Sequence, residues 1–150
     1  MGLNNNQIPV YGITPKTSVG TIATGTAQGT LGATTNASTV ATAGANGCII
    51  DALVASTTSA VAINLYVSIV DSAGTGVRPL GIVAVPANSG NTSGNLAVDV
   101  INAAVLVGMT VDQNGKRIIR LGANETLRVA MAGATLTGIV YVSAQFTDLE

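Results

Sequence analysis

The stretch Val61-Ala62-Ile63-Asn64-Leu65-Tyr66-Val67-Ser68-Ile69 alternates large apolar residues with small or polar ones. Successive side chains of a strand point to opposite faces of a sheet, so this period of two predicts a strand with one buried face. The surrounding residues 52–70 carry no charge and approach the length of a membrane span. The polar interruption at 56–59 and the alternation after it exclude a bilayer helix, and we expect no membrane partner.

Short runs rich in Val and Ile recur from Gly47 to the end, separated by clusters of Gly, Asn, Asp, Ser and Thr. This pattern predicts strand after strand, and no segment has the period of an amphipathic helix. We therefore predict an all-β fold, an antiparallel β-sandwich or jelly roll. The eight strands expected are 48–55, 60–70, 80–85, 95–100, 105–111, 117–121, 126–132 and 138–147.

The segments between these strands have the chemistry of tight turns. An acid followed by a glycine in 71–74 and 112–115, and the break at 122–124, supply side-chain capping and positive φ. The calcium-loop spacing is absent at 112–115, so a hairpin turn is the better interpretation there. Pro79 and Pro86 flank the run 80–85, which favours an edge strand because proline cannot donate to a sheet.

Alternation also assigns an inward face to each of four strands. Small branched side chains dominate these faces, so the core depends on close approach of the two sheets. The residues expected to point inward are Ile50, Ala52 and Val54; Val61, Ile63, Leu65, Val67 and Ile69; Leu127, Val129 and Met131; and Val140, Val142, Ala144 and Phe146.

Residues 1–46 differ from the rest of the chain, because Asn, Thr, Gly, Ala and Ser prevail and apolar residues are thinly spread. We predict two parts, an extended N-terminal arm at 1–46 and a β-sandwich domain at 47–150. A flexible tail and an arm that becomes ordered against neighbouring subunits both fit this composition. Four isolated apolar residues favour the arm, and we expect weak partner contacts from Ile8, Val10, Tyr11 and Ile13.

Charge is scarce throughout the chain. Only 9% of residues are charged, against about 25% in ordinary soluble domains, and the net charge is -1. Such a surface is poorly protected against association, so we expect partners to cover much of it. The basic run 116–120 is too short for sequence-independent nucleic-acid binding and is interpreted as a solvated strand face. Cys48 lies in an apolar run and is expected to be a buried, inert thiol.

The sequence offers no recognisable chemistry. Histidine is absent, which removes the usual general base and metal ligand, and the seven acids are scattered. No nucleophile elbow, Walker loop or dinucleotide fingerprint is present. We predict that the protein is not an enzyme and has no catalytic, cofactor-binding or metal-binding residues.

Several segments resemble small β-sandwich structural proteins of tailed bacteriophages. The resemblance lies in residues 47–67, in Leu80-Gly81-Ile82-Val83-Ala84-Val85-Pro86-Ala87, in 121–129 and in the closing strand 139–148. It covers about two-thirds of the chain, with Asn124 in place of a family glycine and one extra residue in 80–87. The N-terminal segment has no counterpart.

The resemblance implies an auxiliary capsid protein of the decoration or cement kind, often a homotrimer seated on the major capsid protein lattice. The expected location is therefore the virion, on the capsid surface. Three alternatives stay open: a tail- or fibre-associated head-binding or receptor-binding module that binds carbohydrate, a subunit of the main shell or fibre, and a small hydrolase with a carboxylate site. Few tyrosines are available for a sugar platform, and the missing histidine disfavours the hydrolase.

Overall fold

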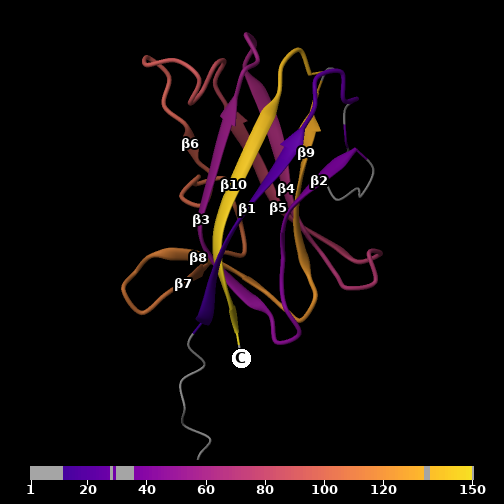
Figure 1. Ribbon diagram of the computed structural model, residues 1–150, viewed down its shortest axis with the longest axis vertical. Coiled ribbons are helices and arrows are strands. Elements are labelled where there is room, and N and C mark those ends of the chain that lie inside the picture. Colours follow the sequence, from indigo (N-terminus) through magenta and orange to yellow (C-terminus); the bar gives the residue numbers. More distant parts are fainter. Residues whose placement is uncertain (1–11, 28, 30–35, 134–135, 150) are drawn as a thin grey trace, which may run out of the picture.

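The computed structural model describes residues 12–27, 29, 36–133 and 136–149 (Figure 1). Every regular element in this part of the chain is a β-strand, and the strands form two antiparallel sheets. The predicted all-β sandwich is confirmed. The strands are β1 (Gly12–Ile22), β2 (Ala37–Thr42), β3 (Cys48–Thr57), β4 (Ile63–Val70), β5 (Val77–Val85), β6 (Val98–Asp99), β7 (Thr110–Val111), β8 (Arg117–Leu121), β9 (Thr126–Ala132) and β10 (Val140–Leu149).

The eight longer strands pair as one long hairpin folded on itself. The first pairs with the last, β1 with β10, and the following pairs are β2 with β9, β3 with β8 and β4 with β5. Pairing of β10 with β3 and of β9 with β4 then joins them into sheets of order β1-β10-β3-β8 and β2-β9-β4-β5. This order is that of a jelly roll. The two-residue strands β6 and β7 extend the first sheet beside β3 and β8.

The sandwich begins well before the boundary predicted at residue 46. Both β1 and β2 belong to the segment expected to be an arm, yet each is a full member of a sheet. They are edge strands, which need few inward apolar residues: Ile22 is buried in β1, and Val40 and Ala41 are buried in β2. The sparse apolar residues of this segment therefore belong to edge strands of the sandwich. Conversely, the strands predicted at 95–100 and 105–111 shrink to the short β6 and β7.

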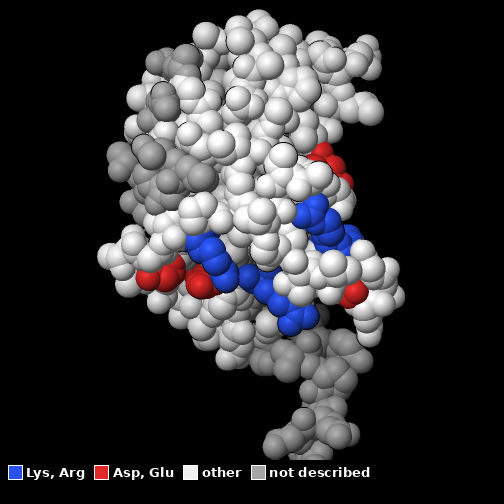
Figure 2. All heavy atoms as spheres, turned by 180° about the vertical axis from the view of Figure 1, so that it is seen from behind, with Lys and Arg blue, Asp and Glu red and all other residues white. Residues whose placement is uncertain are grey.

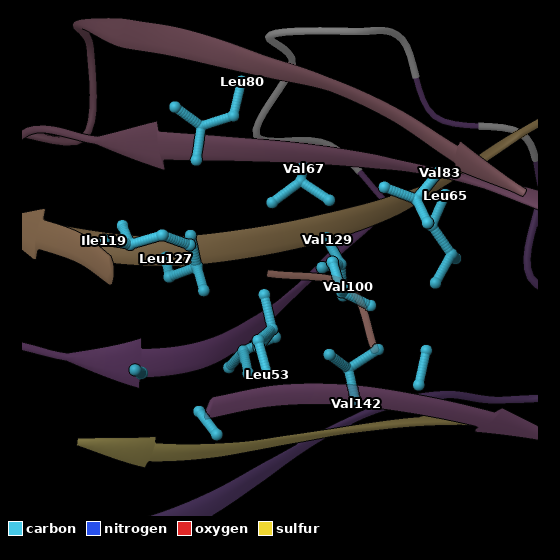
Figure 3. Close-up of a cluster of buried hydrophobic side chains, with 14 of the residues drawn as sticks. Leu53, Leu65, Val67, Leu80, Val83, Val100, Ile119, Leu127, Val129 and Val142 are labelled. Carbon is cyan, nitrogen blue, oxygen red and sulfur yellow. The ribbon is translucent and has the colours of Figure 1, made fainter. Parts of the chain in front are cut away.

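The core lies between the sheets and takes branched side chains from both (Figure 3). Leu53 and Val142 face it from the first sheet, and Leu65, Val67 and Val129 face it from the second. The inward faces predicted for β9 and β10 are confirmed, as is that of β4 from Ile63 to Ile69. Val61 is the exception, because it precedes β4 and is exposed.

A β-bulge reverses the predicted face of β3. Ile50 is buried as expected, but Leu53 and Ala55 point inward in place of Ala52 and Val54. The pairing with β10 explains this, because Gln145 lies opposite Ala52 whereas Phe146 lies opposite Ile50, which leaves Asp51 as an extra residue. One extra residue moves all later side chains to the other face.

The turns and the edge strand follow the sequence closely. The Asp71 carboxylate accepts hydrogen bonds from the amides of Thr75 and Gly76, at 3.0 and 2.9 Å. Asp112 Oδ1 accepts from the amides of Asn114 and Lys116, both at 2.8 Å. These contacts satisfy backbone donors that the reversal leaves unpaired. Strand β5, which contains Pro79, lies at the edge of its sheet as predicted.

The bulge yields a test by paired substitutions in neighbouring residues. Leu53→Ala should lower the free energy of unfolding by about 2–5 kcal/mol, because it opens a cavity in a fully buried site. Val54→Ala, on the outer face, should change it by less than about 1 kcal/mol. Urea denaturation followed by circular dichroism measures both. A larger loss for Val54→Ala would contradict the assigned faces.

Candidate interaction surface

Five of the six acids in the described part of the chain are engaged in structure. Asp71 and Asp112 hold turns, Asp99 accepts a 2.7 Å hydrogen bond from the Asn102 side chain, and Glu125 pairs with Arg78 at 3.5 Å. Across the described residues, no group of three or more Cys, Asp and Glu side chains is placed to hold a metal ion. The same residues contain no helix with the length and apolar character of a membrane span.

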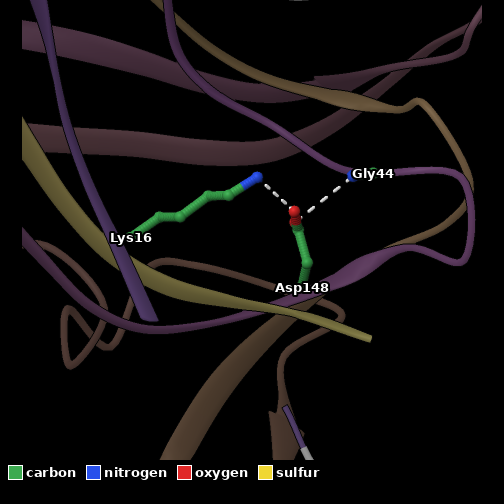
Figure 4. A network of polar contacts seen from close by, with 3 residues as sticks. All are labelled: Lys16, Gly44 and Asp148. Atoms are coloured by element: carbon green, nitrogen blue, oxygen red, sulfur yellow. Dashed lines mark hydrogen bonds and ion pairs between the residues drawn. The ribbon is translucent and has the colours of Figure 1, made fainter. Parts of the chain in front are cut away.

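A small polar network ties the ends of the fold together (Figure 4). Lys16 Nζ of β1 donates to Asp148 Oδ2 of β10, and the Gly44 amide donates to Asp148 Oδ1 at 3.3 Å. Three segments are thereby joined: the first strand, the last strand and the β2–β3 connection. Since the Lys16 side chain is half exposed, the ion pair itself contributes less than about 1 kcal/mol.

Cys48 lies beneath this network and is fully buried, as predicted. Burial raises the pKa of its thiol to about 12, and the negative charge of Asp148 acts in the same direction, while Lys16 opposes it. A thiol that stays protonated at neutral pH is a poor nucleophile. Cys48 is therefore a packing residue.

The basic run 116–120 divides into two roles. Lys116 and Arg120 are exposed, in agreement with a solvated strand face. Arg117 instead donates 2.9 Å hydrogen bonds to the carbonyl oxygens of Ala103 and Leu106. It thus anchors the loop between β6 and β7, and the solvated-face interpretation is wrong for this residue.

Charge is separated along the long axis of the sandwich. Residues 17–50, 52–70, 79–98 and 129–147 contain no charged side chain. The strand pairing brings the described residues of four connections from these stretches to one end of the molecule, which we call the uncharged end: 23–27, 29 and 36; 58–62; 86–97; and 133 and 136–139. Figure 2 shows the upper part of one face without charge and the Lys, Arg and acidic residues gathered below.

The opposite end, which we call the charged end, is formed by the connections 43–47, 71–76 and 122–125. Asp71 and Glu125 belong to these connections, and Arg78 lies close by at the start of β5. Asp99 is an exception to the separation, because it pairs with Val54 in the half of the sheet nearer the uncharged end.

Five hollows on the described surface follow the same division. The two at the uncharged end have volumes of about 240 and 260 Å³ and carry no charged lining residue. Each of the other three contains at least two charged residues, such as Lys16 with Asp51. Val61 and Leu96 project from the uncharged end with 61% and 85% of their surface exposed. This end can therefore bind an uncharged partner surface without burying an unpaired charge.

The structure does not test the four residues predicted to contact partners. Ile8, Val10 and Tyr11 lie outside the described residues, and Ile13 is placed only by its backbone in β1. Sequence reasoning missed the uncharged end because it treated low charge as a property of the whole chain. The four charge-free stretches, combined with the order of strand pairs, were the signal that could have revealed it.

Comparisons with known proteins add little to this picture. The chain matches no family model and none of the curated proteins searched. One solved structure found, titled "Structure of infectious bursal disease virus Gt strain", is 14% identical and gives a TM-score of 0.18. The match covers all of this chain and 46% of that one. A superposition of this quality carries no argument about fold or function.

The buried thiol predicts a specific dependence of stability on pH. The unfolded thiol ionises near its ordinary pKa of 9.0, whereas the folded protein retains the proton up to about 12. The free energy of unfolding should therefore fall as pH rises above 9, by up to about 1.4 kcal/mol per pH unit from this group. Cys48→Ala should lack that part of the decline in urea denaturation at pH 8 and 10.5. Parallel declines in both proteins would contradict it.

Proposed function

We propose that the chain is a virion structural protein of the decoration or cement class, which binds the major capsid protein lattice and stabilises the shell. The observation that carries this proposal is a jelly roll with one end free of charge. Jelly rolls recur in viral capsid and lectin domains, an argument by analogy of fold. The resemblance of residues 47–67, 80–87, 121–129 and 139–148 to phage auxiliary capsid proteins supports the same class.

The chemistry of the surface suits repeated attachment. A contact without charges gains affinity from apolar burial and hydrogen bonds, and many copies on one lattice add their effects. Five of the six acids of the described part of the chain serve turns, local hydrogen bonds or ion pairs, so we infer a binding role without catalysis. Subunits that associate into a homotrimer would present several such surfaces at once.

The second candidate is a tail- or fibre-associated module that binds carbohydrate. Its support is Tyr141, which is partly exposed on the outer face of β10 and could stack on a sugar ring. The ring is flanked across the sheet by Thr21 and Ser56, and the other described tyrosine, Tyr66, lies on the second sheet. One aromatic platform gives this candidate less support than the capsid proposal.

Binding to shells is the direct test. Purified protein should sediment with capsids that lack it, saturate at a fixed ratio to the major capsid protein, and raise the temperature at which the shells disrupt. Its mass in solution, from sedimentation velocity, should be that of a trimer. A monomer that does not bind such capsids but binds a glycan would favour the tail or fibre module.

The arm prediction needs a narrower deletion than the original domain boundary suggests. Removing residues 1–46 would delete β1 and β2, whereas removing 1–11 leaves every described strand. Eleven residues can extend up to about 36 Å from Gly12, enough to reach a neighbouring subunit. The 1–11 deletion should keep the wild-type melting temperature and lower capsid occupancy at limiting protein by severalfold. Unchanged occupancy would show that residues 1–11 do not contribute to capsid binding. It would leave the capsid proposal itself unaffected.

A further inference from the structure

We propose that the uncharged end is the surface that meets the capsid lattice, and that the cleft beside Val61 receives an apolar side chain from an uncharged loop of the shell. This inference rests on the proposed function and specifies the surface that performs it. The partner is defined by chemistry: polar but uncharged backbone and side chains around an apolar contact.

The cleft is built for such a contact. Its apolar lining comes from β4, β9 and the residues next to them, and includes Val61, Ile63, Met131 and Leu136. Ser59 and Thr137, whose hydroxyl oxygens are 3.2 Å apart, also line it. With a volume of about 240 Å³ it has room for one apolar side chain. Filling it would remove apolar surface from water without displacing any ion.

The loops around the cleft are held in place by hydrogen bonds between connections. The Thr58 amide donates to Ile139 O and the Ile139 amide donates to Thr58 Oγ1, both at 2.9 Å. The Asn88 amide donates to Ser59 O at 2.8 Å, which joins the connection 86–97 to the same frame. Gly138 packs so closely on the backbone of Thr58 and Ser59 that a Cβ would clash with it. A surface ordered in advance loses less entropy on binding.

The distribution of charge favours the uncharged end over the charged end as the contact surface. At the charged end and its flanks, the hollows contain Lys16, Asp51, Arg78 and Glu125, so a partner there would need matching charges or would leave ions unpaired. At the uncharged end an apolar partner meets no such cost. The lattice contact should therefore be nearly insensitive to salt, because screening acts on charges.

The test compares two exposed valines, Val61 in the cleft and Val111 in β7. Val61→Asp places a charge at the cleft, whereas Val111→Asp places the same charge on β7 at similar exposure, 61% against 56%. Full-length wild type and both variants, each shown by circular dichroism to be folded, are titrated onto capsids that lack the protein. Val61→Asp should weaken binding by about tenfold or more, the effect of losing about 1.4 kcal/mol, and Val111→Asp by less than about twofold. Raising salt from about 0.1 to 1 M should leave wild-type binding within about threefold.

Each other outcome has a distinct meaning. Wild-type protein that fails to bind capsids would overturn the proposed function itself. Wild-type binding with an unaffected Val61→Asp variant, equal losses in both variants, or a steep salt dependence would overturn the assignment of this surface. A Val61→Asp variant that changes the oligomeric state of the isolated protein would identify the cleft as a contact between copies of this chain and overturn the lattice contact.

Discussion

The pairing of the first strand with the last is the constraint on which the rest of the fold depends. Strand β10 is an inner strand of its sheet, with β1 on one side and β3 on the other. Without β1, the long apolar β10 would become an exposed edge, which is a template for aggregation. The Lys16–Asp148 contact and the bond from Ser18 Oγ to Val40 O then fasten β1 to its neighbours in both sheets. A strand with few apolar residues can therefore be essential because its backbone forms hydrogen bonds with the strand beside it.

This constraint also explains why the ends of the molecule differ. In a hairpin folded on itself, alternate connections fall at opposite ends, so a charge pattern spread along the chain becomes a separation in space. The short turns at the charged end use Asp71 and Glu125 to satisfy backbone amides, and the β7–β8 turn uses Asp112 in the same way. The connections at the uncharged end use hydroxyls and backbone groups for the same purpose. Both solutions satisfy the backbone, but only the second leaves a surface without electrostatic repulsion.

How far the sequence predicts this structure depends on how local the signal is. Leu127, Val129 and Met131 alternate without interruption, and their buried face was predicted correctly. The face of β3 was not, because the bulge at Asp51 is set by its pairing with β10, which no local pattern contains. The strands β1 and β2 were missed for a related reason: their stability comes from partners more than a hundred residues away in β10, and nearly as far away in β9. To predict the uncharged end, one would need to know the order of all four strand pairs.

Low charge makes a protein surface prone to self-association, and in this structure that property is concentrated at the uncharged end. A surface without ions resists self-association poorly, and a protein with a net charge of -1 has little overall repulsion to compensate. In this chain most charged residues lie at or near the charged end, apart from Asp99, and under the proposed function the uncharged end is the one that associates. Its described loops are joined to one another by backbone hydrogen bonds. If this end meets the capsid lattice as we propose, association there would be selective for a partner surface that fits the cleft.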